Sequence, residues 1–253
     1  MIITFLGTGT SQGVPVIACD CKVCNSVDYK DKRLRSAIHV QTDKTSIIVD
    51  IGPDFRQQVL RENILSLDAV VLTHEHKDHT AGLDDVRSYN FKQKKDIPVY
   101  ARINVLNQLK DEFQYIFSST KYPGVPQIEL KEIVNKPFTI NEVGIVPIEV
   151  LHYKLPVFGF RFSSFAYVTD AKTISIQEKL KLKDLDVLVL NALQKTEHIS
   201  HLTLGEAIDL IEEIKPKTAY LTHISHNLGL ASDVSALLPE NIHLAYDGLK
   251  IEV

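Results

Sequence analysis

Three histidines and an aspartate fall within six residues, directly after a run of apolar side chains. The run Ala69–Thr73 has the branched, apolar character of a buried β-strand, and the hexapeptide His74–His79 (His-Glu-His-Lys-Asp-His) follows it at once. Neutral imidazole and carboxylate groups bind zinc, manganese and iron. In so tight a loop, the first two histidines cannot easily share one ion with the aspartate and the last histidine. The spacing therefore predicts two adjacent metal ions at the end of a rigid strand.

Three more strand-like runs end in a residue that can bind a metal. Val146–Leu151 runs into His152, Phe165–Thr169 into Asp170, and Ala219–Thr222 into His223. One such histidine alone is more often structural, but four strand ends of this kind indicate a single site held by rigid elements. An ion with three protein ligands and an open position for water is typical of a catalytic centre. Counting ligands predicts one ion on His74, His76 and His152, a second ion on Asp78, His79 and His223, and Asp170 as the bridge between them.

The cysteines predict a different kind of metal site. All three lie in the segment Cys19-Asp20-Cys21-Lys22-Val23-Cys24, and three thiols cannot all pair within one chain. A closed tetrahedral zinc site needs a fourth ligand in addition to three thiolates. His226 lies three residues after His223, so it can face a different way from the same loop.

The remaining pattern predicts a layered α/β protein in which residues 1–253 form a single domain, because strand-like runs alternate with amphipathic segments and no long Gly/Ser/Pro linker divides them. The clearest helix is Leu204–Ile214, where Thr203 and Glu206 have the spacing of a capping box. Asp247-Gly248 between two apolar runs predicts a tight hairpin. Strands are expected at 2–6, 37–42, 46–51, 69–73, 98–101, 143–151, 158–162, 165–169, 187–191, 219–222, 242–246 and 249–253, and helices at 55–62, 103–117, 174–182, 204–214 and 232–238.

Composition excludes several classes of protein. Hydrophobic residues make up 44% of the chain and charged residues 24%, which is too apolar for a disordered protein. A net charge of -4 argues against nucleic acid or an anionic membrane as the partner. No apolar run approaches the ~20 residues of a membrane helix. The start of the chain has no basic leader. We therefore expect a cytoplasmic protein.

The hexapeptide with the later ligands in the order His152, Asp170, His223 resembles the metallo-β-lactamase superfamily. That resemblance covers nearly the whole chain and implies a four-layer αββα sandwich with the two-metal site at one edge of the sheets. Four other segments indicate which members of the superfamily the chain resembles: the loop Gly7–Pro15 before the cysteines, Gly82–Arg87, His201-Leu202-Thr203 and the segment Leu221–His226. Together these resemble the phosphodiesterases of phosphoribosyl 1,2-cyclic phosphate in the carbon–phosphorus lyase pathway and their relatives.

This narrower resemblance implies two catalytic divalent metals, zinc or manganese, and a structural zinc on Cys19, Cys21, Cys24 and His226. It implies hydrolysis of a small, cyclic phosphodiester, such as phosphoribosyl 1,2-cyclic phosphate, by a hydroxide that bridges the two metals. Asp78 or Asp170 would orient the hydroxide. His201 would act on the phosphate or on the leaving oxygen, with His198 in the same loop as the alternative. A homodimer is common among the resembling proteins.

Three alternative functions remain. A tRNA 3′-processing endonuclease of the same superfamily would need a basic arm to grip tRNA, and no long Gly/Pro/Lys-rich insertion is present. A thioester or lactam hydrolase could use the same metals but would leave His201 without a phosphate to act on. A non-catalytic partner protein in cofactor biosynthesis would be favoured by a missing metal ligand, but every expected position is filled.

Overall fold

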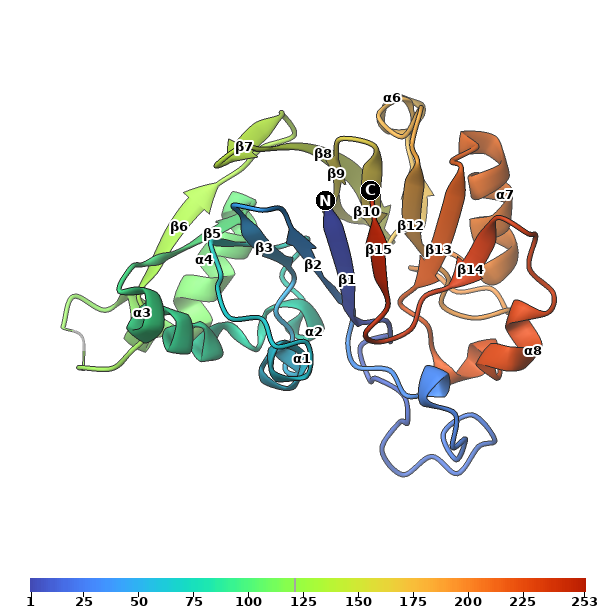
Figure 1. The fold of residues 1–253 in the computed structure, drawn as a ribbon, viewed down its shortest axis with the longest axis horizontal. Coiled ribbons are helices and arrows are strands. Elements are labelled where there is room, and N and C mark those ends of the chain that lie inside the picture. Colours follow the sequence, from blue (N-terminus) through green and yellow to red (C-terminus); the bar gives the residue numbers. More distant parts are fainter. Residues whose placement is uncertain (121) are drawn as a thin grey trace.

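The computed structural model describes residues 1–120 and 122–253, and it places two mixed β-sheets face to face (Figure 1). The first sheet has the order β15-β1-β2-β3-β4-β5-β6. Its strands β15, β1, β2 and β3 pair antiparallel, and β3 to β6 pair parallel. The strands are β1 (Ile2–Gly7), β2 (Ala37–Gln41), β3 (Ser46–Val49), β4 (Ala69–Val71), β5 (Ile97–Ala101), β6 (Ile128–Glu132) and β15 (Lys250–Glu252).

The second sheet repeats this arrangement. Its order is β11-β8-β9-β10-β12-β13-β14, with antiparallel pairs up to β10 and parallel pairs from β10 to β14. A short strand, β7 (Phe138–Ile140), pairs with β8. The strands are β8 (Val143–His152), β9 (Leu155–Phe162), β10 (Phe165–Val168), β11 (Thr173–Ile174), β12 (Val187–Asn191), β13 (Thr218–Thr222) and β14 (Ile242–Leu244).

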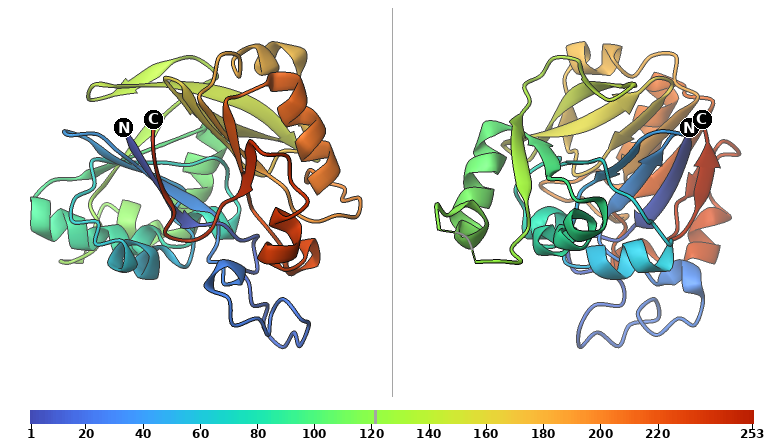
Figure 2. Two further views of the ribbon diagram at one scale, coloured as in Figure 1. Left: turned by 45° about the vertical axis from the view of Figure 1, so that its right-hand side comes forward. Right: turned by 60° about the vertical axis from the view of Figure 1, so that its left-hand side comes forward.

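Helices cover the outer face of each sheet, which gives the four layers αββα (Figures 1 and 2). The helices are α1 (Phe55–Arg61), α2 (Lys77–Thr80), α3 (Arg87–Gln93), α4 (Ile103–Glu112) and α5 (Gln114–Phe117) beside the first sheet, and α6 (Ile176–Leu180), α7 (Leu204–Ile214) and α8 (Ala231–Ser235) beside the second. The predicted fold class is therefore confirmed.

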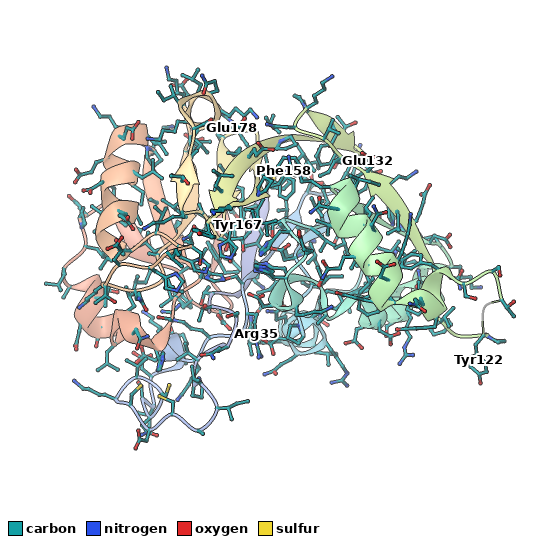
Figure 3. All side chains as sticks on the ribbon, turned by 180° about the vertical axis from the view of Figure 1, so that it is seen from behind. Arg35, Tyr122, Glu132, Phe158, Tyr167 and Glu178 are labelled. Atoms are coloured by element: carbon teal, nitrogen blue, oxygen red, sulfur yellow. The ribbon has the colours of Figure 1, made fainter. Side chains whose placement is uncertain are left out.

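Three apolar layers hold these elements together. Between the sheets, Phe5 and Val49 from one sheet pack in the same cluster as Phe158 and Tyr167 from the other, and Figure 3 shows the last two in the interior. The other layers lie between each sheet and its helices. Strands such as β12 are buried on both faces, so they read as apolar runs rather than as alternating patterns, and in β12 only the last residue, Asn191, is polar.

Helix α7 shows how the local sequence sets an element. The Thr203 hydroxyl accepts a hydrogen bond from the Glu206 backbone N–H at 3.2 Å, and the Glu206 carboxylate accepts one from Thr203 N–H at 2.8 Å. This reciprocal cap starts the helix where the spacing predicted. Ala207, Leu210 and Ile211 form its buried face against the second sheet.

The predicted hairpin at Asp247-Gly248 is wrong. β14 pairs with β13 in the second sheet, whereas β15 pairs with β1 in the first, so the turn carries the chain from one sheet to the other. The Asp247 carboxylate accepts hydrogen bonds from Thr8 Oγ1 at 2.7 Å and from Leu34 N–H at 2.8 Å. These contacts hold the turn against the N-terminal loop, and they replace the cross-strand pairing that a hairpin requires.

Candidate metal centre

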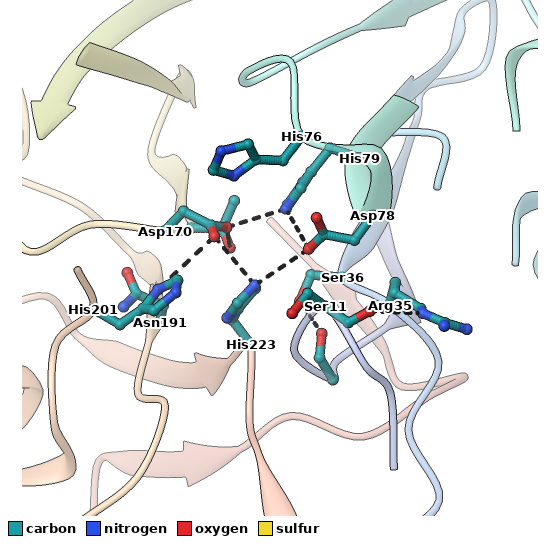
Figure 4. Close-up of polar contacts among 12 residues, drawn as sticks. Ser11, Arg35, Ser36, His76, Asp78, His79, Asp170, Asn191, His201 and His223 are labelled. Atoms are coloured by element: carbon teal, nitrogen blue, oxygen red, sulfur yellow. Dashed lines mark hydrogen bonds and ion pairs between the residues drawn. The ribbon is translucent and has the colours of Figure 1, made fainter. Parts of the chain in front are cut away.

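The predicted strand ends meet at one edge of the two sheets. β4 leads to the hexapeptide, β8 ends at His152, β13 ends directly before His223, and β10 ends two residues before Asp170. Asp170 and His223 adopt left-handed backbone conformations, with φ of 58° and 55°. Such conformations are uncommon outside glycine. They turn the chain sharply as it leaves the strands, and Figure 4 shows the two side chains directed at one another.

The first predicted ligand set is brought together. Ligand atoms of His74, His76 and His152 all lie within 4.8 Å of one another. His74 Nε2 is 3.0 Å from His76 Nδ1. His152 donates from Nδ1 to the Ser200 carbonyl oxygen at 3.0 Å, which leaves its Nε2 lone pair free to bind a metal.

The second predicted set also converges. Asp78, His79 and His223 offer ligand atoms within 4.8 Å of one another. His79 Nε2 lies 3.1 Å from a carboxylate oxygen of Asp78 and 3.3 Å from one of Asp170, and His223 Nε2 lies 3.2 Å from the other oxygen of Asp170. Asp170 also joins His74 and His79 in a three-residue group. It therefore lies between the two sets, as a bridging ligand must (Figure 4).

Divalent cations fit these residues. His79 Nε2 and both ring nitrogens of His223 are buried, and within the described part of the chain they have no hydrogen-bond partner. Buried polar atoms are rarely left in that state. A set of imidazoles and carboxylates matches zinc or manganese. The structure thus supports binding of divalent metal, while the assignment of each ligand to an ion stays a prediction.

The charges of the site suit metal ligands. Burial alone would raise the pKa of Asp170, but the His223 and His79 imidazoles hold it well below its usual range. The pKa of Asp78 is lowered in the same way, because His79 and His223 outweigh its burial. Burial holds the pKa of His74 well below its usual value, so this imidazole is neutral. The surrounding carboxylates outweigh burial at His79 and raise its pKa well above the usual value, so His79 must release a proton to bind a metal. Ionised carboxylates and neutral imidazoles are the forms that bind metal.

Asp50 is a site residue that the sequence analysis missed. It is fully buried at the end of β3 with φ of 66°. Its carboxylate accepts hydrogen bonds from His79 Nδ1 at 2.7 Å and from the backbone N–H of Thr73 at 2.9 Å. Thr73 Oγ1 also donates to Asp50 at 2.9 Å and accepts from His74 Nδ1 at 2.9 Å. Asp50 thus fixes the orientation of two histidines and directs the Nε2 lone pair of each into the site.

Of the two histidines before α7, His201 reaches the site. It is buried, and its Nδ1 is 3.8 Å from an Asp170 oxygen (Figure 4). His198 is half-buried and accepts a hydrogen bond from Ser200 N–H at 3.3 Å. Burial, together with His223, lowers the pKa of His201 to about 3, so the free side chain is neutral at pH 7.

The cysteine segment forms the second predicted cluster. His226 Nδ1 lies 3.3, 3.4 and 3.5 Å from the sulfur atoms of Cys19, Cys21 and Cys24. The backbone N–H of Cys24 and the His226 ring lower the pKa of Cys21 to about 6, which favours its thiolate. This Cys₃His set fits a tetrahedral zinc ion that would join the N-terminal loop to the loop after β13. Its occupancy by zinc stays a prediction.

The fold and these clusters define a class of protein, and comparison with known proteins shows which family that class is. A β-lactamase superfamily domain matches residues 45–224, and the chain belongs to the metallo-β-lactamase superfamily. It is PhnP-like: a solved diphosphatase from the PhnP family is 40% identical with a TM-score of 0.94, over 100% of this chain and 97% of the other. The matched family and this neighbour together support a metal-dependent hydrolase.

Two further relatives show how far this similarity extends. An octanoyltransferase from Porphyromonas gingivalis is 42% identical over 97% of this chain and 50% of its own length, so the chain spans about half of that relative. The Zn²⁺-bound structure of PqqB from Methylobacterium extorquens has a TM-score of 0.83 at 18% identity, over the full length of both chains, which is a likeness of fold. Among the described residues, no helix is long and apolar enough to cross a membrane.

Proposed function

We propose that this chain is a phosphodiesterase that hydrolyses a small phosphodiester, and that residues 1–253 work as one hydrolase domain. The similarity to a PhnP-family diphosphatase supports chemistry at phosphorus, because that relative shares 40% of its residues with this chain. A cyclic ribose phosphate, such as phosphoribosyl 1,2-cyclic phosphate, is the first specific substrate to test.

The position of His201 carries the proposal. Both predicted ligand sets are complete without it, yet it lies buried 3.8 Å from Asp170, the residue shared by the two sets, and it offers a ligand atom within 4.8 Å of those of His152 and Asp170. Its Nδ1 has no hydrogen-bond partner among the residues that the structure describes. A donor placed there can bind a phosphoryl oxygen or the leaving oxygen of a phosphodiester. The negative charge of a bound phosphate would favour its protonated form.

The other residues have separate tasks. His74, His76 and His152 would hold one metal, and Asp78, His79 and His223 the other, with Asp170 shared. Two divalent ions, when bound, supply a nucleophile at neutral pH and neutralise phosphate charge. The ionised carboxylates of Asp78 and Asp170 can accept hydrogen bonds from an attacking water and so orient it. His201 would stabilise or protonate the leaving oxygen.

Turnover of bis(p-nitrophenyl) phosphate by the manganese-reconstituted protein tests the proposal, with an acyl thioester run in parallel. We expect diester turnover that His76→Ala and Asp170→Asn abolish while the fold survives. His243→Ala is the matched control, because His243 is an exposed histidine on β14, outside both clusters. Retained activity in folded His76→Ala or Asp170→Asn protein would exclude the two-metal assignment.

A thioester hydrolase is the second candidate, and the octanoyltransferase relative favours it. That protein is named for an acyl group and is 42% identical to this chain, but half of it lies outside the match. Thioester turnover without diester turnover would select this candidate.

The oligomeric state, the cellular location and the identity of the metals stay predictions. We propose a cytoplasmic homodimer with no nucleic-acid partner and with zinc in the Cys₃His cluster. Sedimentation gives the mass in solution, and elemental analysis of the purified protein gives the metals.

A further inference from the structure

A hollow of about 580 Å³ opens beside the metal centre. Two segments line it together with His76: the turn between β8 and β9, and the loop before α7. Because His76 and His152 belong to the first ligand set, a substrate whose phosphate lies at the metals has its non-reacting end within reach of this hollow. The lining side chains outside that set include Tyr153, Lys154 and Ile199.

Tyr153 occupies an unusual place in this lining. His152 pairs with Leu155, so the turn between the strands contains only Tyr153 and Lys154. Tyr153 has φ of 56°, and in two-residue turns a residue with this conformation is usually glycine, asparagine or aspartate. Its side chain gains little from packing, because the residue is 49% exposed. Neither the fold nor the metal clusters explain a tyrosine here, and such strained positions often serve a ligand.

The neighbouring side chains complete a surface for a flat, negatively charged ligand. Lys154 Nζ lies over one face of the Tyr153 ring, 5.2 Å from its centre, so a base would stack on the opposite face. Ile199, which is 66% exposed, adds an apolar surface from the other segment. Aromatic rings bind the bases of nucleotides by stacking, and a lysine close by attracts the phosphates of the same nucleotides.

We propose that this hollow binds the non-reacting end of the substrate, and that Tyr153 stacks there on the base of a nucleoside. The inference rests on the proposed phosphodiesterase function, and it favours substrates that carry a nucleoside over simple alkyl esters and over phosphoribosyl 1,2-cyclic phosphate, which has no base. Lys154 adds positive charge at the same place. Tyr153 acts on binding and has no part in the reaction itself.

Calorimetric titration of the manganese-loaded protein tests this without turnover. The two ligands are adenosine 5′-monophosphate and methyl phosphate, which carry the same phosphate monoester, so their ratio of Kd isolates the nucleoside. We expect the nucleotide to bind at least about tenfold more tightly, the size of one stacking contact. Tyr153→Asn should bring the ratio close to one, since asparagine tolerates the positive φ, and Tyr153→Phe should keep it.

Tyr115→Asn is the matched control, because Tyr115 is 46% exposed and is not part of the hollow's lining. Equal Kd values for the two ligands in the wild-type protein would overturn the inference, and so would an unchanged ratio in folded Tyr153→Asn protein. Turnover of bis(p-nitrophenyl) phosphate is measured on the same samples. Turnover without nucleotide preference refutes the inference alone, and preference without turnover refutes the proposed function alone.

Discussion

Asp50→Asn tests how the chain positions its metal ligands. The Asp50 carboxylate accepts the Thr73 backbone N–H at 2.9 Å on one oxygen and His79 Nδ1 at 2.7 Å on the other. An asparagine can keep the first hydrogen bond through its carbonyl oxygen, and it tolerates the φ of 66° as well as aspartate does. Its amide N–H₂ then faces His79 Nδ1. His79 must move its proton to Nε2, the atom that faces Asp78 and Asp170.

We therefore expect a folded protein with weakened metal binding. Loss of such a hydrogen bond behind a metal-binding histidine typically lowers metal affinity by about 10- to 100-fold, which corresponds to about 1.4–2.8 kcal/mol. Competition with a chromogenic chelator measures the affinity of metal-stripped protein for Mn²⁺ or Zn²⁺. Diester turnover should fall at limiting metal and recover in part when metal is in excess.

Asp68→Asn is the matched control for this experiment. Asp68 also accepts a backbone N–H, from Ser46 at 2.9 Å, but it pairs with Lys95 at the surface and contacts no histidine of the site. The Asp68→Asn protein should bind metal with the same affinity as the wild-type protein. Affinity of folded Asp50→Asn protein within about threefold of the wild-type value would refute the role of Asp50.

Three further predictions concern separate parts of the molecule. Cys21→Ser should lose about one bound zinc and lower the melting temperature while diester turnover per catalytic metal persists; unchanged zinc content and melting would exclude the cysteine site. His201→Ala should lower diester kcat by about 10²–10⁴-fold at unchanged metal content, and a parallel loss of metal would instead make His201 a ligand. Burial, with the charge of Lys250, lowers the pKa of His39 to about 4 from 6.5. Because the unfolded chain takes up that proton first, the stability that neutral His39 contributes is present above pH 6.5 and is lost as the pH falls towards 4, by about 2 kcal/mol at pH 5. Urea unfolding of His39→Gln protein should show a pH dependence shallower by that amount, and an equal slope in both proteins would contradict it.

Most of the candidate site could be predicted because its ligands follow apolar strands. A strand buried on both faces can be recognised in the sequence as an apolar run, and a histidine or aspartate directly after that run stands out as a candidate ligand. Asp50 follows the same rule but is hidden in the sequence, because the apolar Ile51 comes directly after it and makes it look like part of the strand predicted at 46–51. A polar residue that interrupts the end of such a run is the signal that would have found it.

Other features depend on contacts between distant segments. β6 has the sequence Ile-Glu-Leu-Lys-Glu and lies at the edge of its sheet. Because an edge strand buries few side chains, its sequence has no apolar run, and the sequence does not predict it. The chain after β14 crosses to the other sheet because Asp247 binds Thr8 and Leu34, more than 200 residues away. The hollow beside Tyr153 likewise joins two segments, and neither segment shows it alone.

Titration of metal-stripped protein with Mn²⁺, followed by turnover of bis(p-nitrophenyl) phosphate, tests the central claim most directly. Because the two ligand sets share Asp170, we expect turnover to rise with added metal and to reach its plateau at two equivalents beyond the zinc of the cysteine cluster. Turnover in metal-free protein, a plateau at one equivalent, or no diester turnover in fully loaded protein would contradict a two-metal phosphodiesterase.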